Sequence, residues 1–217
     1  MILTIFGDVH GNLVALEKMF EIEKAQTDFF VCHGDVVNYG PWTKECIEFL
    51  KNIQNVKLLK GNHEKYFIDG NYDGTNIVAK AFFNHCFVNF DDELVRIISE
   101  YENDFQVNEF SIQHTINNQY VFADTNLSNL QIDRNYIIGH SHQQFELEKD
   151  NFKIYNTGSL GQNRQFINQS CYLKLDTETG KLELKNFLHN IDLVINQMKS
   201  ARYPQICIDY YLLKNRI

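Results

Sequence analysis

The chain is short of positive charge, with 20 Lys and Arg against 28 Asp and Glu among its 217 residues and a net charge of −8. Proteins that bind duplex nucleic acid usually present a clustered basic face, so this balance argues against such a partner. No apolar run approaches the ~20 residues that a membrane-spanning helix needs, which argues against a membrane protein. The segment Met1–Phe6 has no basic flank, and we do not expect it to be a signal peptide.

Cysteine is also scarce. The chain has five cysteines, an odd number, and they never occur as Cys-x-x-Cys. This spacing indicates neither a disulfide framework nor a thiolate zinc site. We therefore expect reduced thiols and a cytoplasmic protein. The cysteines are Cys32, Cys46, Cys86, Cys171 and Cys207.

The first third of the chain repeats one pattern three times: a short apolar segment, a glycine and then a polar side chain. The apolar segments Ile2–Phe6, Phe29–His33 and Val56–Lys60 are predicted strands. This β-α-β-α-β order predicts a parallel sheet covered by helices, with polar side chains at the carboxyl ends of its strands. The predicted helices are Leu13–Lys24, with Asn12 as its N-cap, and Thr43–Ile53.

Five short polar blocks carry the side chains that could bind metal. Two metal ions about 3.5–4 Å apart need a bridging carboxylate and surrounding nitrogen and oxygen ligands, and they share a water that becomes hydroxide near neutral pH. Each block alone would be a weak motif, but together they supply the full set. The blocks are Gly7-Asp8-Val9-His10-Gly11-Asn12, Gly34-Asp35, Gly61-Asn62-His63-Glu64, His114 and Gly139-His140-Ser141-His142.

After the third predicted strand the pattern changes. Residues Lys65–Asn108 contain a Gly/Asn/Asp-rich loop and then helical periodicity through Val78–Tyr101, which we interpret as a helical insertion beside the site. Alternating segments after it predict a second sheet, with a hairpin turn at Glu178–Lys181. The predicted strands are Phe110–Ile112, Gln119–Ala123, Tyr136–Ile138, Phe145–Glu148, Phe152–Tyr155, Cys171–Leu175 and Leu182–Phe187.

The last region, residues 185–217, is predicted to hold a strand and a closing helix. The helix is expected at Ile191–Ala201, and Pro204 is expected to end it. With 44% hydrophobic residues the chain can form a large core, so we predict a single domain over residues 1–217.

Taken in this order, the polar blocks resemble those of the calcineurin-like metallophosphoesterases, in particular the small prokaryotic phosphodiesterase-like branch. The resemblance runs from Gly7 to about Arg164. It implies an α/β fold, an αββα sandwich of two mixed sheets with helices outside and a small helical insertion. It also implies a metal-dependent phosphoesterase that acts on a small phosphate ester.

The resemblance further implies two groups of metal ligands joined by one carboxylate. Carboxylate and imidazole ligands suit Mn, Fe, Co, Ni or Zn better than Mg or Ca, so we expect two divalent transition-metal ions. An isolated histidine is more often an ordinary side chain, and only the whole constellation favours ligation. By resemblance, Asp8, His10 and His142 bind one ion, Asn62, His114 and His140 bind the other, and Asp35 bridges them.

Two of these positions depend on local arguments. His140 and His142 are two residues apart, so on a strand they would share a face. His114 departs from the family pattern, because Thr115 follows it where the family commonly has glycine. No other histidine between Cys86 and Ile138 could replace it.

His63 resembles the family's catalytic histidine, which lies near the leaving group and donates a proton to it. A purely structural role beside the metals is the alternative, and Glu64 is expected to orient the imidazole. The remaining histidines, His33, His85 and His189, are interpreted as structural.

The segment Asn156–Arg164 resembles one that follows the last histidine block in many smaller members. Its Asn, Gly and Ser content is equally explained by a turn between strands. Arg164 could instead bind a phosphate through two hydrogen bonds, and the sequence does not decide between the two.

Tyr39 distinguishes between branches of the family. Phosphoprotein phosphatases and diadenosine tetraphosphatases have an arginine at this position, so Tyr39 favours the phosphodiesterase-like branch. The resemblance then implies hydrolysis of a phosphodiester by a hydroxide shared between the metals, with His63 as general acid. The alternatives are a phosphomonoesterase for small molecules or phosphoproteins, and a non-catalytic scaffold of the same fold, against which the complete ligand set argues. The sequence does not indicate an oligomeric state.

Overall fold

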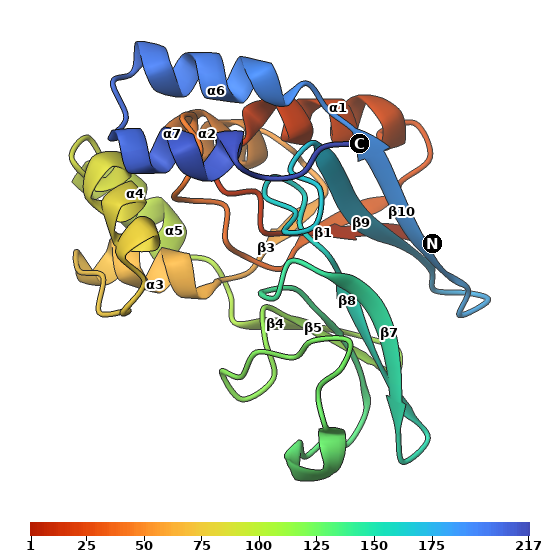
Figure 1. Ribbon diagram of the computed structural model, residues 1–217. Coiled ribbons are helices and arrows are strands. Elements are labelled where there is room, and N and C mark those ends of the chain that lie inside the picture. Colours follow the sequence, from red (N-terminus) through yellow and green to blue (C-terminus); the bar gives the residue numbers. More distant parts are fainter.

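Two five-stranded sheets pack face to face in the computed structural model, which describes residues 1–217 (Figure 1). The first sheet consists, in spatial order, of β10 (Leu182–Leu188), β9 (Gln169–Asp176), β1 (Ile2–Phe6), β2 (Phe29–Cys32) and β3 (Val56–Leu58). Strands β1, β2 and β3 are parallel, as predicted, and β9 runs antiparallel to both of its neighbours, β1 and β10.

The second sheet is also mixed. It consists of β4 (Asp104–Val107), β5 (Phe110–Gln113), β6 (Asn135–Ile138), β8 (Phe152–Thr157) and β7 (Gln144–Lys149) in spatial order. Its central strands β5, β6 and β8 are parallel, and the two edge strands are antiparallel to their neighbours. Strand β4 was not predicted and lies at the end of the segment interpreted as a helical insertion.

The prediction that all later strands belong to the second sheet was wrong for β9 and β10. Strand β9 pairs with the free edge of β1, from Ile2 opposite Asp176 to Ile5 opposite Leu173. Alternation of apolar residues shows which face of a strand is buried but not which neighbour it pairs with. Leu173 and Leu175 enter the same core as Ile5, so both placements satisfy the pattern.

The predicted strand Gln119–Ala123 is not formed. This segment lies in the long loop between β5 and β6, whose only regular element is the 3₁₀ turn Leu127–Asn129. Val121 is buried against Ile138 and Ile154 on the outer face of the second sheet. Its apolar character therefore reflects packing of a loop onto a sheet rather than strand pairing.

Seven helices complete the fold, and two of the helix predictions were incomplete. The helical stretch expected through Val78–Tyr101 is broken, because Asp91 caps a new helix by accepting the backbone N–H of Leu94. The helix predicted at Ile191–Ala201 is formed at Ile191–Ser200, but it is not the last one, because Pro204 precedes a further helix, a position that its fixed φ suits. The N-cap Asn12 is confirmed. The helices are α1 (Leu13–Glu23), α2 (Thr43–Lys51), α3 (Asn62–Asp69), α4 (Ile77–Phe87), α5 (Asp92–Ser99), α6 (Ile191–Ser200) and α7 (Gln205–Leu212).

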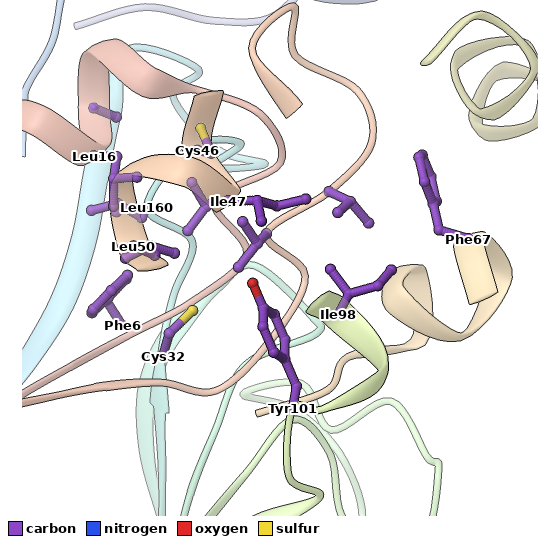
Figure 2. Packing of buried hydrophobic residues seen from close by; sticks show 14 of the residues in the cluster. Phe6, Leu16, Cys32, Cys46, Ile47, Leu50, Phe67, Ile98, Tyr101 and Leu160 are labelled. Atoms are coloured by element: carbon purple, nitrogen blue, oxygen red, sulfur yellow. The ribbon is translucent and has the colours of Figure 1, made fainter. Parts of the chain in front are cut away.

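Helices α1, α2, α6 and α7 lie together on one side of the first sheet, and α3, α4 and α5 gather at one end (Figure 1). Alternate residues of β1 enter different cores: Leu3 and Ile5 pack between the sheets, whereas Phe6 packs beneath α1 and α2. Figure 2 shows this second core, with Leu16 of α1 and Ile47 of α2. Strands β1 and β2 are thus held from both faces. None of the helices has the length and apolarity required to cross a bilayer.

Candidate metal centre

The polar blocks meet at one edge of the sandwich, on the loops that follow β1, β2, β5 and β6 and at the start of α3. The ligand atoms come from segments as far apart in the chain as Asp8 and His142, which are 134 residues apart. The first sheet supplies Asp8, His10, Asp35 and Asn62, and the second sheet supplies His114, His140 and His142.

The first cluster consists of Asp8, His10 and His142, whose ligand atoms lie within 4.8 Å of one another. Nε2 of His142 lies 3.2 Å from Oδ1 of Asp8 and 3.2 Å from Nε2 of His10. Nδ1 of His10 lies 3.1 Å from the carbonyl oxygen of Val37, and Nδ1 of His142 lies 2.7 Å from that of Gln162. A carbonyl oxygen only accepts, so each Nδ1 carries a proton and each Nε2 is left with a lone pair.

This arrangement fits a bound cation. Two acceptor nitrogens and a carboxylate oxygen face one another in a buried place, and Oδ1 of Asp8 has no hydrogen-bond partner. Such acceptors repel one another unless positive charge lies between them. A hydrogen bond from the second nitrogen to a carbonyl is also how proteins orient metal-binding imidazoles. Burial raises the pKa of Asp8, but positive charge at the neighbouring imidazoles, that of His142 first, would outweigh burial and hold the pKa below its usual value, so this carboxylate favours a cation in that place.

The second cluster is centred on His114. Its Nε2 lies 3.2 Å from Oδ2 of Asp35, 3.1 Å from Nδ1 of His140 and 3.1 Å from Oδ1 of Asn62. One carboxylate, two imidazoles and one amide oxygen form a donor set that suits a divalent transition metal. Burial lowers the pKa of His114, but the Asp35 carboxylate outweighs burial and raises this pKa to about 9. The cluster therefore favours positive charge at this point.

Asp35 lies between the two clusters. Its Oδ2 is 3.2 Å from Nε2 of His114 and 3.8 Å from Nε2 of His10, and its Oδ1 accepts the backbone N–H of His63 at 2.8 Å. Gly61 permits this approach, because a Cβ atom there would collide with Oδ1 of Asp35. Burial raises the pKa of Asp35, but the imidazoles, that of His114 first, hold it well below its usual value.

Many of these residues have an unusual backbone. A left-handed φ is uncommon for residues other than glycine, costs about 1–3 kcal/mol each, and is concentrated at functional sites. Five of the seven residues predicted as ligands adopt it: Asp8 (47°), His10 (48°), Asp35 (55°), His140 (69°) and His142 (57°). The backbone thus turns sharply where each of these side chains enters the site.

The expectation that His140 and His142 share a strand face was wrong. Strand β6 ends at Ile138, and both histidines follow it in a loop. Their left-handed backbone breaks the two-residue alternation of a strand. His140 therefore enters the second cluster, and His142 enters the first.

His63 lies beside the clusters, with its ring centre 4.9 Å from that of His10. His63, His10 and Asp35 also satisfy metal-ligand spacing, so distance alone does not separate a proton donor from a ligand. The tautomer does. The side-chain amide of Asn38, as oriented, donates to Nδ1 of His63 at 2.9 Å, which leaves the proton of the neutral ring on Nε2. Burial lowers the pKa of His63 against the opposing charge of Asp35, so the neutral ring is favoured.

Glu64 does not orient His63 as we had expected. It is fully buried, and its carboxylate accepts only backbone N–H groups, which draws the loop after β2 onto the start of α3. Burial and the charge of Asp35 raise the pKa of Glu64 to about 7, whereas the N–H groups favour its ionised form. The donors are Gly61 (2.7 Å), Asp35 (2.7 Å), Val36 (2.8 Å) and Val37 (3.2 Å).

We expect Glu64→Gln to destabilise the protein by about 2–4 kcal/mol. The amide nitrogen that replaces one carboxylate oxygen cannot accept hydrogen bonds, so the backbone N–H groups that face it would be buried without an acceptor. For a chain of this size the melting temperature should fall by roughly 5–15 °C. Thermal unfolding followed by circular dichroism measures this. Glu21→Gln, an exposed change on α1, is the control. A melting temperature of Glu64→Gln within 1 °C of the control would contradict the role assigned to this carboxylate.

The segment Asn156–Arg164 supports the ligand loops. The side-chain amide of Asn156 donates to the carbonyl of Gly139 at 2.7 Å, and the hydroxyl of Ser159 donates to the carbonyl of Asp8 at 2.8 Å. The segment is therefore more than a turn between strands, because it holds loops of both clusters in place.

Arg164 lies at the rim of the site. Its side chain is exposed, and Cζ is 5.8 Å from the ring centre of Tyr120. Tyr120 in turn stacks on His140, with ring centres 3.8 Å apart. Arg164 makes no ion pair with a carboxylate, so its charge is available at the side of the second cluster.

The three histidines interpreted as structural lie outside the metal-ligand groupings. Each has a packing or hydrogen-bond partner in the fold. Nε2 of His33 contacts Oγ1 of Thr157 (2.7 Å), Nε2 of His189 contacts Nδ2 of Asn12 (3.0 Å), and the ring of His85 packs on Tyr203 with centres 3.9 Å apart.

The sequence interpretation missed two residues of the site. Asn38 sets the tautomer of His63, and its place three residues after Asp35 was the available indication. Tyr120 stacks on His140 but lies in a segment mistaken for a strand, and nothing in its sequence surroundings pointed to the site.

The fold and the site together define an α/β protein of the metallophosphoesterase class. The sequence matches the model of the calcineurin-like phosphoesterase family over residues 1–159, and the chain belongs to this family. It is a metal-dependent phosphoesterase.

Individual proteins agree with this assignment. An uncharacterized protein of Methanocaldococcus jannaschii is 25% identical over 229 residues, which cover 94% of this chain and 94% of that protein. The structure of a metallophosphoesterase from Sphaerobacter thermophilus aligns with a TM-score of 0.81 at 21% identity and covers 98% of both chains. The structure of a novel archaeal phosphodiesterase aligns with a TM-score of 0.51 at 19% identity and covers 86% of this chain and 100% of that one. At these identities the two structures support the fold.

Proposed function

We propose that the protein hydrolyses a phosphodiester at a centre of two divalent metal ions. The observation that carries the proposal is the position of Asp35 between two imidazole clusters, at 3.2 Å from His114 and 3.8 Å from His10. A carboxylate shared in this way is what a pair of ions requires. Asp8, His10 and His142 would hold one ion, and Asn62, His114 and His140 would hold the other.

When bound, the ions would polarise the phosphate oxygens and lower the pKa of a water to near neutrality. The donor set suits Mn, Fe, Co, Ni or Zn, and we favour manganese for the first tests. The protein's own residues then orient the substrate and move one proton.

His63 is the proposed general acid. Its Nε2–H is a donor, in contrast to the lone pair that His10 directs into the first cluster, because Asn38 occupies Nδ1. To act as an acid the ring must be the imidazolium, with the Asn38 amide turned so that its otherwise unpartnered Oδ1 accepts from Nδ1–H. The imidazolium would then pass its Nε2 proton to the departing oxygen, neutralise the alkoxide as it forms and return to the neutral ring. Arg164, exposed and without an acidic partner, is proposed to bind a non-bridging phosphate oxygen at the rim.

Tyr39 favours a diester over a phosphoprotein. Its ring packs against His10, with centres 4.8 Å apart, and against His63 at 5.3 Å. The position therefore offers no cation to the second negative charge of a phosphomonoester. A phosphomonoesterase remains the second candidate, favoured only by the unpaired charge of Arg164. The archaeal protein described as a phosphodiesterase agrees with the first candidate.

We further propose that residues 1–217 act as one domain on a small phosphate ester in the cytoplasm. All five cysteines are free, and four of them are buried, which suits a reducing compartment. The acidic balance of the chain supports a partner other than duplex nucleic acid.

The direct test uses protein stripped by a chelator and reloaded with Mn, Co or Ni. Hydrolysis of bis(4-nitrophenyl) phosphate should vanish on stripping and return on reloading, because the ligands are nitrogen and oxygen donors. The kcat/KM for this diester should exceed that for a phosphoserine peptide by at least about tenfold. Full activity in metal-free protein would reject the metal mechanism, and a preference for the phosphopeptide would reject the substrate class.

A further inference from the structure

A polar cavity of about 380 Å³ opens beside the second cluster, with Asn62 and His114 in its wall. Its lining contains no hydrophobic residue and no carboxylate. The remaining wall comes from the ends of β3 and β5, from α3 and from the loop after β5. We call it the Lys60/Lys65 cavity after its two cationic residues.

The two lysines of this cavity lack acidic partners. Neither Lys60 nor Lys65 forms an ion pair. By contrast, Lys57, in the strand β3 that precedes Lys60, pairs with Glu102 at 2.6 Å. Lys60 is half-buried, and Lys65 is exposed. Two ammonium groups that form no ion pair thus lie beside the metal centre of a chain whose net charge is −8.

Four amide side chains of the wall are also without a protein partner. The side chains of Asn103, Gln113, Asn117 and Asn118 line the cavity and make no hydrogen bond to another protein group. Asn117 and Asn118 also have a left-handed backbone, with φ of 53° and 56°. The cavity therefore presents amide and ammonium donors and no hydrophobic side chain.

We propose that the Lys60/Lys65 cavity is a subsite for a second phosphate group of the substrate. This inference rests on the proposed function, because the scissile phosphate must lie on the metal clusters for a neighbouring group to reach the cavity. An aromatic or aliphatic substituent would find no hydrophobic side chain to pack against there, and an uncharged polar one would leave two ammonium charges without a counter-ion. Lysine binds phosphate as a flexible point charge, and the amide donors complete its hydrogen bonds. The substrate class is thus a phosphodiester with a phosphate-bearing, hydrophilic substituent.

A matched pair of chromogenic diesters tests the subsite. Thymidine 5′-(4-nitrophenyl phosphate) has a single phosphate, and its 3′-phosphorylated form differs only by the second one. With manganese-loaded protein, kcat/KM for the 3′-phosphorylated diester should be about tenfold higher, which corresponds to ~1.4 kcal/mol. The advantage should shrink at high salt, since it is electrostatic.

The double variant Lys60→Gln, Lys65→Gln should lose this preference and keep the kcat/KM for the singly phosphorylated diester. Lys24→Gln, which removes an exposed charge at the C-terminal end of α1, is the control and should keep the preference. Equal kcat/KM for the two diesters in the native protein, or a preference that survives the double variant, would overturn the subsite.

Equilibrium binding separates this inference from the proposed function. Thymidine 3′,5′-bisphosphate should bind the manganese-loaded native protein about tenfold more tightly than thymidine 5′-phosphate, and the double variant should bind both equally. Failure to hydrolyse either diester would reject the proposed function, while the two dissociation constants from calorimetry would still decide for or against the subsite.

Discussion

Asp35→Asn is expected to reduce the metal content and to lower kcat/KM for diesters by about 10³-fold or more. The carboxylate lies between the imidazoles of His114 and His10, and an amide removes both its charge and one of its acceptor oxygens. Loss of one partner from a buried set of opposite charges costs about 3–5 kcal/mol, so the affinity for metal should fall by roughly 10²–10⁴-fold. Elemental analysis of the purified variant and titration of stripped protein with Mn measure this.

Asp124→Asn is the matched control, since Asp124 is exposed in the loop after β5 and makes no ion pair. It should keep native metal content and activity. If Asp35→Asn still bound two ions per chain with native affinity, Asp35 would not bridge them.

His63→Ala should keep both metals and slow turnover by about 10²–10⁴-fold, the usual contribution of a positioned general acid. Its imidazole donates from Nε2, whereas His10 and His142 direct lone pairs into the first cluster. The deficit should be smallest for diesters of nitrophenol, whose anion needs little protonation, and largest for diesters of aliphatic alcohols. Rates across leaving groups of different pKa, combined with metal analysis, measure the effect.

Asn62→Ala provides the contrast, because Asn62 is adjacent to His63 in sequence but is proposed to bind metal rather than to donate a proton. Loss of Oδ1 of Asn62, which lies 3.1 Å from Nε2 of His114, should weaken one ion and slow all substrates alike. A metal-depleted His63→Ala protein, or a deficit that does not depend on the leaving group, would remove His63 from the acid role and make it a ligand.

The general plan of the fold was accessible from the sequence because local patterns encode it. The glycine and aspartate after Phe6 mark the end of a parallel strand, and the same pattern after β2 marks a second. Such strand ends meet at one edge of a sheet, so the aspartates were predicted to approach each other. The pairing of β9 with β1 could not be predicted from the sequence. Leu173 would be buried between the sheets whichever of the two sheets β9 joined.

The residues of the site were accessible to different degrees. Side chains such as Asp8 and His142 were named correctly as neighbours in space because their motifs are ordered along the chain. The hydrogen bonds that orient the side chains of the site were not predicted. Asn38 reaches His63, and Glu64 turns away from it to the backbone, only because the loop after β2 follows a left-handed course that no local preference announces.

The left-handed backbone at five proposed ligands also makes the site more fragile than the fold that carries it. Each such residue would return to an ordinary conformation, with a gain of about 1–3 kcal/mol, if its surroundings loosened. The cores on both faces of β1 are what prevent this. A substitution deep in either core, remote from any ligand, would therefore inactivate the enzyme at temperatures where its sheets and helices are still intact, so that inactivation and unfolding would be separate transitions.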